Sequence, residues 1–132
     1  MNITALDHLV LTVADIDRSI DFYTRVLGMQ EITFGEGRKA LLFGSQKINL
    51  HRQGAEIVPH AQTPVCGSAD LCLLTDTPLV QVEQELAAHG VALLSGIVPR
   101  TGAVGPIDSL YLRDPDGNLL EISRYRGAGM AV

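Results

Sequence analysis

The sequence is poor in several residue types whose abundance defines whole classes of proteins. It has no tryptophan, two cysteines among 132 residues, and 5% aromatic residues. Cys66 and Cys72 are too few for a disulfide framework and do not have CxxC spacing. Cys72 falls in an apolar segment and is expected to be a small core residue. No apolar run approaches the ~20 residues that span a bilayer, so a membrane partner is not expected.

Clustered basic charge is also missing. The chain carries 10 Lys and Arg against 15 Asp and Glu, which gives a net charge of −5. Proteins that bind nucleic acid or anionic membrane surfaces usually display a basic patch, so neither is an expected partner. The N-terminus lacks the pattern of a signal peptide, and we expect a cytoplasmic protein. The 46% of hydrophobic residues is enough to bury a core.

Hydrophobic periodicity predicts the same order of elements twice. The first half has a strand at 6–13, a helix, and strands at 29–34, 39–44 and 47–52. The second half has a strand at 69–75, a helix, and strands at 91–98, 110–113 and 118–123. We therefore expect an α+β fold of duplicated βαβββ modules that form a cupped, mixed sheet. The single domain over 1–132 would consist of module one at 5–53, a linker at 54–68 and module two at 69–125.

The helices carry apolar stripes and recognisable ends. Asp15 is a good N-cap for the first helix, and Thr77 followed by Pro78 is typical of an N-cap and the first helical residue. Gly28 and Gly90, 62 residues apart, lie where the two helices should end. The expected buried stripes are Ile16, Ile20, Tyr23 and Leu27 in the first helix, and Leu79, Val82 and Leu86 in the second.

One carboxylate near the C-terminus has an apolar setting. Asp114-Pro-Asp-Gly117 has the chemistry of a tight turn between two strands. In the strand that follows, Leu120 and Ile122 share one face, whereas Leu119, Glu121 and Ser123 share the other. A charged group on a buried sheet face needs a partner, which would be a metal ion, an Arg or a Lys.

Four strands place a potential metal ligand on the face opposite the helix. His8 and Asp70 are related by the offset of 62, and Glu121 answers to His51 or Asn49 at an offset of 70 or 72. Imidazoles and carboxylates together suit Mn, Fe, Co, Ni or Zn. Each residue also has an ordinary explanation. The histidines could be hydrogen-bonded structural residues, Asp70 could pair with a backbone turn, and Glu121 could form an ion pair with Arg113 or Arg124.

Three motifs, with the repeat, resemble the vicinal oxygen chelate superfamily: Asp7-His-Leu-Val-Leu11, Ser19-Ile-Asp-Phe-Tyr-Thr-Arg-Val-Leu-Gly-Met29 and Asp114-Pro-Asp-Gly-Asn-Leu-Leu-Glu121. This group includes glyoxalase I, fosfomycin-resistance proteins, extradiol dioxygenases and metal-free bleomycin-binding proteins. Lys47–His51, Gly67–Cys72 and Val98–Pro106 resemble the branch of glyoxalase-domain-containing protein 5.

The resemblance implies a divalent ion that is chelated by two neighbouring oxygens of a small-molecule substrate. His8 matches the ligand on the first strand and Glu121 the ligand on the last strand, while Asp70 lies where many relatives have His. The fourth-strand ligand of the family aligns best with Asn49, and His51 lies two residues on. If His51 turns inward, two histidines and two carboxylates complete the set, so the expected ligands are His8, His51, Asp70 and Glu121. The resemblance also implies a homodimer.

Three functions are compatible with the resemblance. In glyoxalase-like lyase or isomerase chemistry, the ion acts as a Lewis acid and Glu121 moves the proton, and Arg100, in a loop at 95–109, would meet an anionic substrate. In an extradiol dioxygenase Tyr111 would contact the substrate, but no His is present at 102–104. A non-catalytic drug-binding protein would not need the ligands. We favour the glyoxalase-like enzyme.

Overall fold

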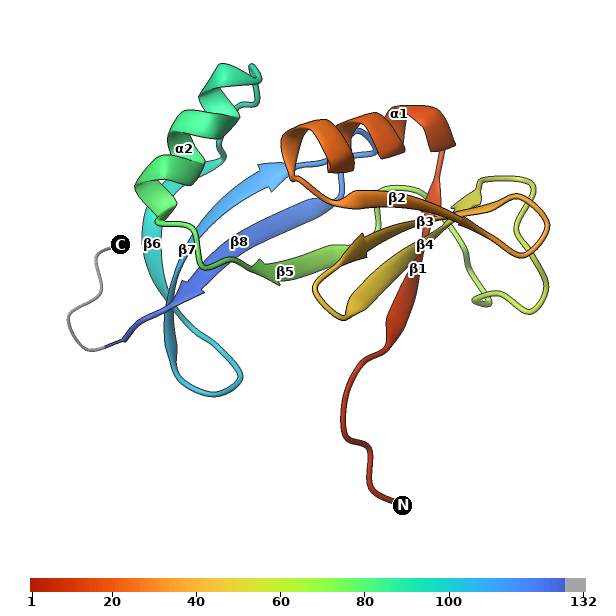
Figure 1. Cartoon of the computed structure of the whole chain (residues 1–132), viewed down its shortest axis with the longest axis horizontal. Coiled ribbons are helices and arrows are strands. Elements are labelled where there is room, and N and C mark those ends of the chain that lie inside the picture. Colours follow the sequence, from red (N-terminus) through yellow and green to blue (C-terminus); the bar gives the residue numbers. More distant parts are fainter. Residues whose placement is uncertain (128–132) are drawn as a thin grey trace. The chain divides into compact units, whose positions relative to one another are not determined.

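The structure, a computed structural model, describes residues 1–127 and divides into two compact units between Ser68 and Ala69. The first unit contains β1 (His8–Val13), α1 (Ile16–Asp21), the π-helical turn η1 (Phe22–Val26), β2 (Gln30–Phe34), β3 (Arg38–Phe43) and β4 (Gln46–Arg52). The second unit contains β5 (Asp70–Leu74), α2 (Leu79–Ala88), β6 (Ser95–Thr101), β7 (Pro106–Arg113) and β8 (Leu119–Tyr125) (Figure 1). Within the described residues, no helix has the length and apolar character to cross a membrane.

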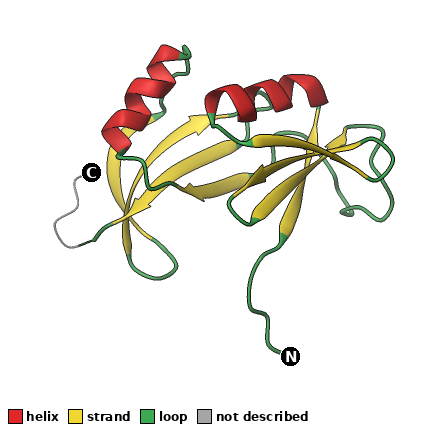
Figure 2. Ribbon diagram, viewed as in Figure 1, coloured by secondary structure: helices red, strands yellow, loops and turns green. Residues whose placement is uncertain are grey.

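Each unit is one four-stranded mixed sheet accompanied by helix on one side (Figure 2). The strand orders are β1-β4-β3-β2 and β5-β8-β7-β6, so the two sheets have the same topology. In both, the first strand runs parallel to the last, and the other pairs are antiparallel. The predicted α+β fold of duplicated βαβββ units is therefore confirmed.

The parallel registers decide how the two halves correspond. His8 pairs with Lys47 in the first unit, and Asp70 pairs with Leu119 in the second. The first strands are thus offset by 62 and the last strands by 72. At this offset the counterpart of Glu121 is Asn49.

The first helix begins and ends as predicted. The Asp15 carboxylate accepts a hydrogen bond from the backbone N–H of Arg18 at 3.1 Å, which makes Asp15 the N-cap. After η1, Gly28 adopts a φ of 73° and its N–H donates to the Thr24 carbonyl at 3.1 Å. Only glycine adopts this conformation readily, so the chain can turn directly into β2. Ile20 and Tyr23 of the predicted stripe are buried.

The N-cap predicted for the second helix is wrong by one residue. Pro78, not Thr77, is the N-cap, because its carbonyl accepts the first helical hydrogen bond from Val82 N–H at 3.1 Å. The Thr77 N–H instead donates to the Thr75 hydroxyl at 3.1 Å. The apolar stripe of α2 is buried as predicted, at Leu79, Val82 and Leu86.

Alternation along the strands separates the core from the opposite face. In the second unit Leu110, Leu112 and Leu120 are fully buried, and Ile122 is 7% exposed. Their neighbours Tyr111 and Glu121, which are opposite each other in the β7–β8 ladder, lie on the other face. The predicted division of residues 119–123 between the two faces is confirmed.

The loop predicted at 95–109 is largely strand. β6 extends to Thr101 and β7 begins at Pro106, so only residues 102–105 connect them. Gly102 N–H donates to the Gly105 carbonyl at 2.8 Å, and the Tyr125 hydroxyl accepts from Val104 N–H at 3.1 Å. Glycine and proline indicated a loop, but β6 is an edge strand, where proline is tolerated.

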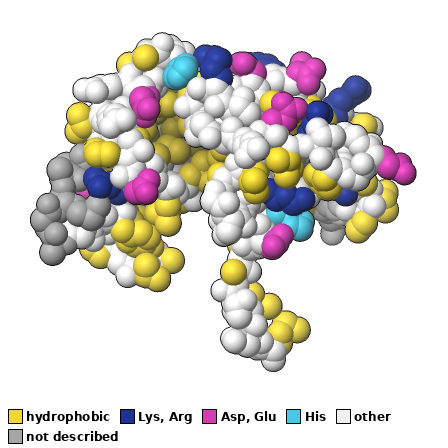
Figure 3. Space-filling view, in the orientation of Figure 1, with side chains coloured by type: hydrophobic (Ala, Val, Ile, Leu, Met, Phe, Trp, Pro, Cys, Tyr) yellow, Lys and Arg dark blue, Asp and Glu magenta, His cyan; other side chains and the backbone are white. Residues whose placement is uncertain are grey.

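The surface outside the sheets is mixed in character. Figure 3 shows charged side chains of both signs and hydrophobic side chains, with hydrophobic groups along the N-terminal segment that precedes β1. Met1, Ile3 and Leu6 are the exposed hydrophobic residues of that segment.

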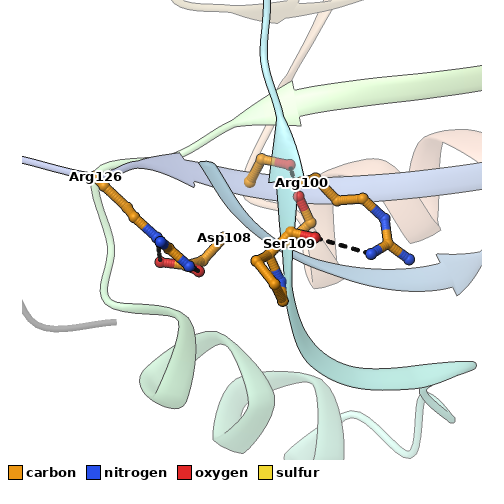
Figure 4. A network of polar contacts seen from close by, with 6 residues as sticks. Arg100, Asp108, Ser109 and Arg126 are labelled. Atoms are coloured by element: carbon orange, nitrogen blue, oxygen red, sulfur yellow. Dashed lines mark hydrogen bonds and ion pairs between the residues drawn. The ribbon is translucent and has the colours of Figure 1, made fainter. Parts of the chain in front are cut away.

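An ion pair ties the end of β8 to β7. The Arg126 guanidinium faces the Asp108 carboxylate (Figure 4), and its Nη2 lies 2.7 Å from Oδ1, while Nε donates to both carboxylate oxygens at 3.1 Å. The hydrogen bonds from Arg126 hold the pKa of Asp108 below its usual range.

This pair predicts a specific acid sensitivity. Because the pKa of Asp108 is lower in the folded state, its stabilisation is complete above the unfolded pKa of about 4 and is lost as pH falls through the folded value. We expect Asp108→Asn to be less stable than wild type at pH 7 and to lose less stability between pH 5 and pH 2 in urea unfolding. Equal pH slopes for the two proteins would contradict the ion pair.

Candidate functional site

Glu121 lies at the centre of the face of the second sheet that is opposite α2. It pairs with Cys72 of β5 on one side and with Tyr111 of β7 on the other, and it is half-buried. Directly opposite residues on one face have Cβ atoms about 5 Å apart, so the thiol, the carboxylate and the phenol form one row.

A chain of hydroxyl groups leads to the Glu121 carboxylate. Ser123 Oγ lies 3.3 Å from Glu121 Oε2, 2.6 Å from Ser109 Oγ and 3.2 Å from Cys72 Sγ. An ionised carboxylate only accepts hydrogen bonds, so Ser123 must donate its single proton to Glu121. Ser109 and Cys72 must then both donate to Ser123. The network orders the carboxylate and requires Cys72 to be a protonated thiol.

The prediction that Cys72 is a core residue is wrong. Cys72 is exposed, because it has the same parity in β5 as Asp70 and therefore lies on the face away from α2. Partial desolvation of its sulfur raises the pKa of the thiol, and the Glu121 charge raises it further.

Arg100 and Tyr111 are joined on the same face. Arg100 Nε donates to the Tyr111 hydroxyl oxygen at 2.9 Å, and the guanidinium carbon lies 5.4 Å from the ring centroid. Arg100 also donates to the Pro99 carbonyl at 2.9 Å, visible as a dashed line in Figure 4. Arg100 is therefore on a strand and not on a lid loop, and Tyr111 keeps its own hydroxyl proton for another acceptor.

Two carboxylates of this face have no cationic partner. Asp70 pairs with Leu119, so it is a diagonal neighbour of Glu121 at about 7–8 Å. Within residues 1–127, neither carboxylate forms an ion pair, and Asp70 accepts no hydrogen bond. Within these residues Asp70 therefore does not pair with a backbone turn, and Glu121 does not form an ion pair with Arg113 or Arg124. Arg124 lies on the opposite face from Glu121, and Arg113 donates to the Gly117 carbonyl.

His8 is exposed in the first unit and is oriented by its neighbour. Its Nδ1 lies 2.8 Å from Asp7 Oδ2. If Nδ1 carries the proton of this hydrogen bond, Nε2 presents its lone pair outward. This arrangement of carboxylate and imidazole is typical of histidines that bind metals.

His51 is buried and is not brought close to His8. His51 pairs with Thr12, which is four residues from His8 in β1. Along the strand, this separation corresponds to a backbone distance of about 13 Å. Its side chain is 4% exposed and neither ring nitrogen has a hydrogen-bond partner within the described chain. Burial lowers the pKa of His51, and the charges of Arg38 and His60 lower it further. Asn49, two residues closer to His8, is 5% exposed with an unpartnered Oδ1.

The registers therefore make two pairs equivalent, His8 with Asn49 in the first unit and Asp70 with Glu121 in the second, and the predicted ligand His51 belongs to neither pair. No group of three or more His, Cys, Asp or Glu residues able to hold a metal ion occurs among residues 1–127. Sequence reasoning placed Ser123 on the face of Glu121 but missed Cys72 and Ser109 as neighbours of this carboxylate. Strict alternation from Asp70 would have found Cys72, whereas Ser109 lies outside the strand predicted at 110–113 and inside the observed β7.

Residues 5–122 match the family model for the Glyoxalase/Bleomycin resistance protein/Dioxygenase superfamily. The virulence protein STM3117 of Salmonella typhimurium is 55% identical over 95% of this chain and 87% of its own length. Its crystal structure has a TM-score of 0.94 and is matched over 96% of this chain and all 100% of that chain.

Two further relatives are similarly close. The integron cassette protein VCH_CASS1 from the mobile metagenome of V. cholerae is 56% identical, with a TM-score of 0.94 over 96% of this chain and 98% of that one. The glyoxalase domain-containing protein RDO1 of Mycosarcoma maydis is 53% identical over 97% of this chain and 72% of its own length.

More distant relatives carry the names of enzymes. Metallothiol transferase FosB of Staphylococcus epidermidis is 27% identical over 92% of this chain and 82% of its own length. Glyoxylase I 4 of Arabidopsis thaliana is 28% identical over 92% of this chain and 71% of its own length.

The hydroxyl network predicts how Cys72 reacts. In a Cys66→Ser background, Cys72 is the single thiol, and Glu121→Gln removes a charge that raises its pKa. We expect the pH midpoint of its alkylation by iodoacetamide to fall in the Glu121→Gln variant, with faster reaction at pH 8. Glu85→Gln on α2 is the matched control and should leave the midpoint unchanged. An unchanged or raised midpoint in Glu121→Gln would contradict the network.

Proposed function

Because the chain belongs to the Glyoxalase/Bleomycin resistance protein/Dioxygenase superfamily, we propose that it is a divalent-metal-dependent enzyme with lyase or isomerase chemistry like that of glyoxalase I. Its substrate is a small molecule with two neighbouring oxygen atoms. The observation that supports this most is Glu121, a half-buried carboxylate with an ordered hydrogen bond and no cationic partner among residues 1–127.

The donor chemistry of each unit suits a divalent ion. Members of the superfamily typically use divalent metals. The second unit offers the neighbouring carboxylates Asp70 and Glu121, and the first unit offers the imidazole of His8. Oxygen and imidazole nitrogen ligands, without a thiolate, suit Mn, Fe, Co, Ni or Zn. By register, the counterpart of Glu121 in the first unit is Asn49 rather than His51.

Each side chain on the face of the second sheet has a role in this proposal. Asp70 and Glu121 would hold the divalent ion, and a bound ion would supply Lewis-acid polarisation of the neighbouring oxygens of the substrate. Glu121 moves the proton between adjacent carbon atoms, and Ser123 fixes the direction of its lone pairs. Tyr111 donates its free hydroxyl proton to the substrate, and Arg100 holds that hydroxyl in place.

The names of the relatives agree with an enzyme only in part. The two distant relatives named as enzymes are a metallothiol transferase and a glyoxylase I. The relatives above 50% identity are named only as a virulence protein, an integron cassette protein or a glyoxalase domain-containing protein. The reaction is therefore proposed from membership of the superfamily together with the residues around Glu121.

The proposal predicts metal content. In protein purified without chelators, we expect elemental analysis to find a bound divalent ion in wild type and little in Glu121→Gln or His8→Ala. Asp7→Asn, which removes the partner of His8, should weaken metal binding by roughly 10–100-fold. His60→Ala and Glu85→Gln are the matched controls for removal of an imidazole and a carboxylate. Unchanged metal content in both ligand variants would overturn the proposal.

The reaction class is tested by turnover. With metal restored, we expect wild type to isomerise methylglyoxal in the presence of a thiol, and Glu121→Gln to be roughly 10²–10⁴-fold slower. Oxygen uptake that depends on a catechol would instead indicate the dioxygenase reaction, in which Tyr111 contacts the substrate. Binding of small molecules without either turnover would indicate a binding protein.

A further inference from the structure

Two cations of the first unit lie against one aromatic ring, and no carboxylate of residues 1–127 forms an ion pair with either. The Arg38 guanidinium carbon is 4.8 Å and Lys47 Nζ is 3.8 Å from the centroid of the Phe34 ring. Both distances are measured to the same centroid. The separation of the two charges therefore cannot exceed the sum of these two distances. Neither side chain forms an ion pair or a hydrogen bond with any of residues 1–127.

The lack of a partner is notable in an acidic chain. Acidic residues outnumber basic ones by 15 to 10, yet none of the carboxylates among residues 1–127 forms an ion pair with these two cations. Lys39, the next residue to Arg38 in β3, points to the other face and pairs with Glu31 at 3.0 Å. Two like charges that are held close together repel each other, and an anion near both offsets this repulsion. The ring positions both cations, so a ligand would not have to immobilise them.

The strand registers place the cations on the face opposite α1. Phe34 pairs with Arg38, and Lys47 pairs with Leu42 in β3 and with His8 in β1. Directly paired residues share a face, and alternate residues of one strand share it too. Arg38, Lys47, Asn49 and His51 therefore lie on one face, which also carries His8.

The same face holds buried polar atoms that have no partner. Asn49 Oδ1 and both ring nitrogens of His51 make no hydrogen bond within the described chain, although these side chains are only 5% and 4% exposed. Buried polar atoms without partners are rare in folded proteins. Lys39 pairs with Leu50, so the β3–β4 register brings the adjacent Arg38 alongside His51, and the charge of Arg38 lowers the pKa of His51. The carboxylate that acts on His51, Glu56, accepts a hydrogen bond from Gly54 N–H at 2.9 Å.

From these observations we propose that the Phe34, Arg38 and Lys47 cluster binds an anionic group, a carboxylate or a phosphate, of the molecule on which this protein acts. The anion lies near both cations, and the polar part of the ligand satisfies Asn49 and His51. This inference rests on the proposed function, and it makes the substrate a small organic anion. It assigns side chains of the first unit to the binding of that anion.

Anion binding to metal-free protein tests the proposal independently of turnover. Full-length protein is treated with a chelator, and titrated with inorganic phosphate or with malonate by calorimetry at constant ionic strength set with chloride. We expect saturable binding of at least one of the two probes. Arg38→Gln and Lys47→Gln should each weaken it by about tenfold or more, because each removes a charged partner of the anion. The probe that binds more tightly identifies the class of anion.

The matched control is Lys39→Gln, which removes one positive charge from the same strand on the opposite face. It should change the affinity by less than twofold, and Lys47→Arg, which keeps the charge, should retain most of the binding. Thermal melting shows whether each variant is folded, and Lys47→Gln decides the outcome if Arg38→Gln does not fold. Absence of saturable binding for both probes, or an equal loss in Lys39→Gln, would overturn the proposal. Absence of a bound divalent ion in wild-type protein, with anion binding intact, would instead count against the proposed function alone.

Discussion

The parallel pairing of the first and last strands is the constraint on which both units depend. It joins β1 to β4 and β5 to β8, and thereby fixes which side chains face the helix and which face away. A slip of one residue would turn Glu121 toward the core and Leu120 outward, which costs buried apolar area and desolvates a charge. The leucines that form the core thus also hold the carboxylate in position.

The two units share this scaffold but differ in chemistry. The second unit presents Asp70 and Glu121 with serine hydroxyls, a thiol and a phenol, whereas the equivalent face of the first unit presents His8, Asn49 and two cations on Phe34. The face of the second unit carries the carboxylates that are proposed to hold a divalent ion and to move a proton. The face of the first unit carries the two cations that are proposed to bind an anion, together with His8, a proposed metal ligand.

The sequence was sufficient for the fold and for much of the face that carries Glu121. Alternation along strands and apolar stripes along helices are strong signals, and Asp15 and Gly28 marked the ends of the first helix correctly. The choice between Asn49 and His51 could not be made, because an offset of 70 or 72 preserves the face, and only hydrogen-bonded register distinguishes them. Arg100 was misplaced because Pro99, Gly102 and Gly105 indicated a loop where an edge strand tolerates proline. The contact of Lys47 with Phe34 joins two strands that are not adjacent, so no local pattern reports it.

The central claim is that Glu121 and Asp70 bind a divalent ion, and anomalous diffraction from crystals grown with manganese would test it most directly. The account predicts an anomalous peak about 2.0–2.3 Å from a carboxylate oxygen of Glu121, with Asp70 as a second ligand. A peak remote from both residues, or a Glu121 carboxylate in an ion pair with an arginine or lysine, would contradict it.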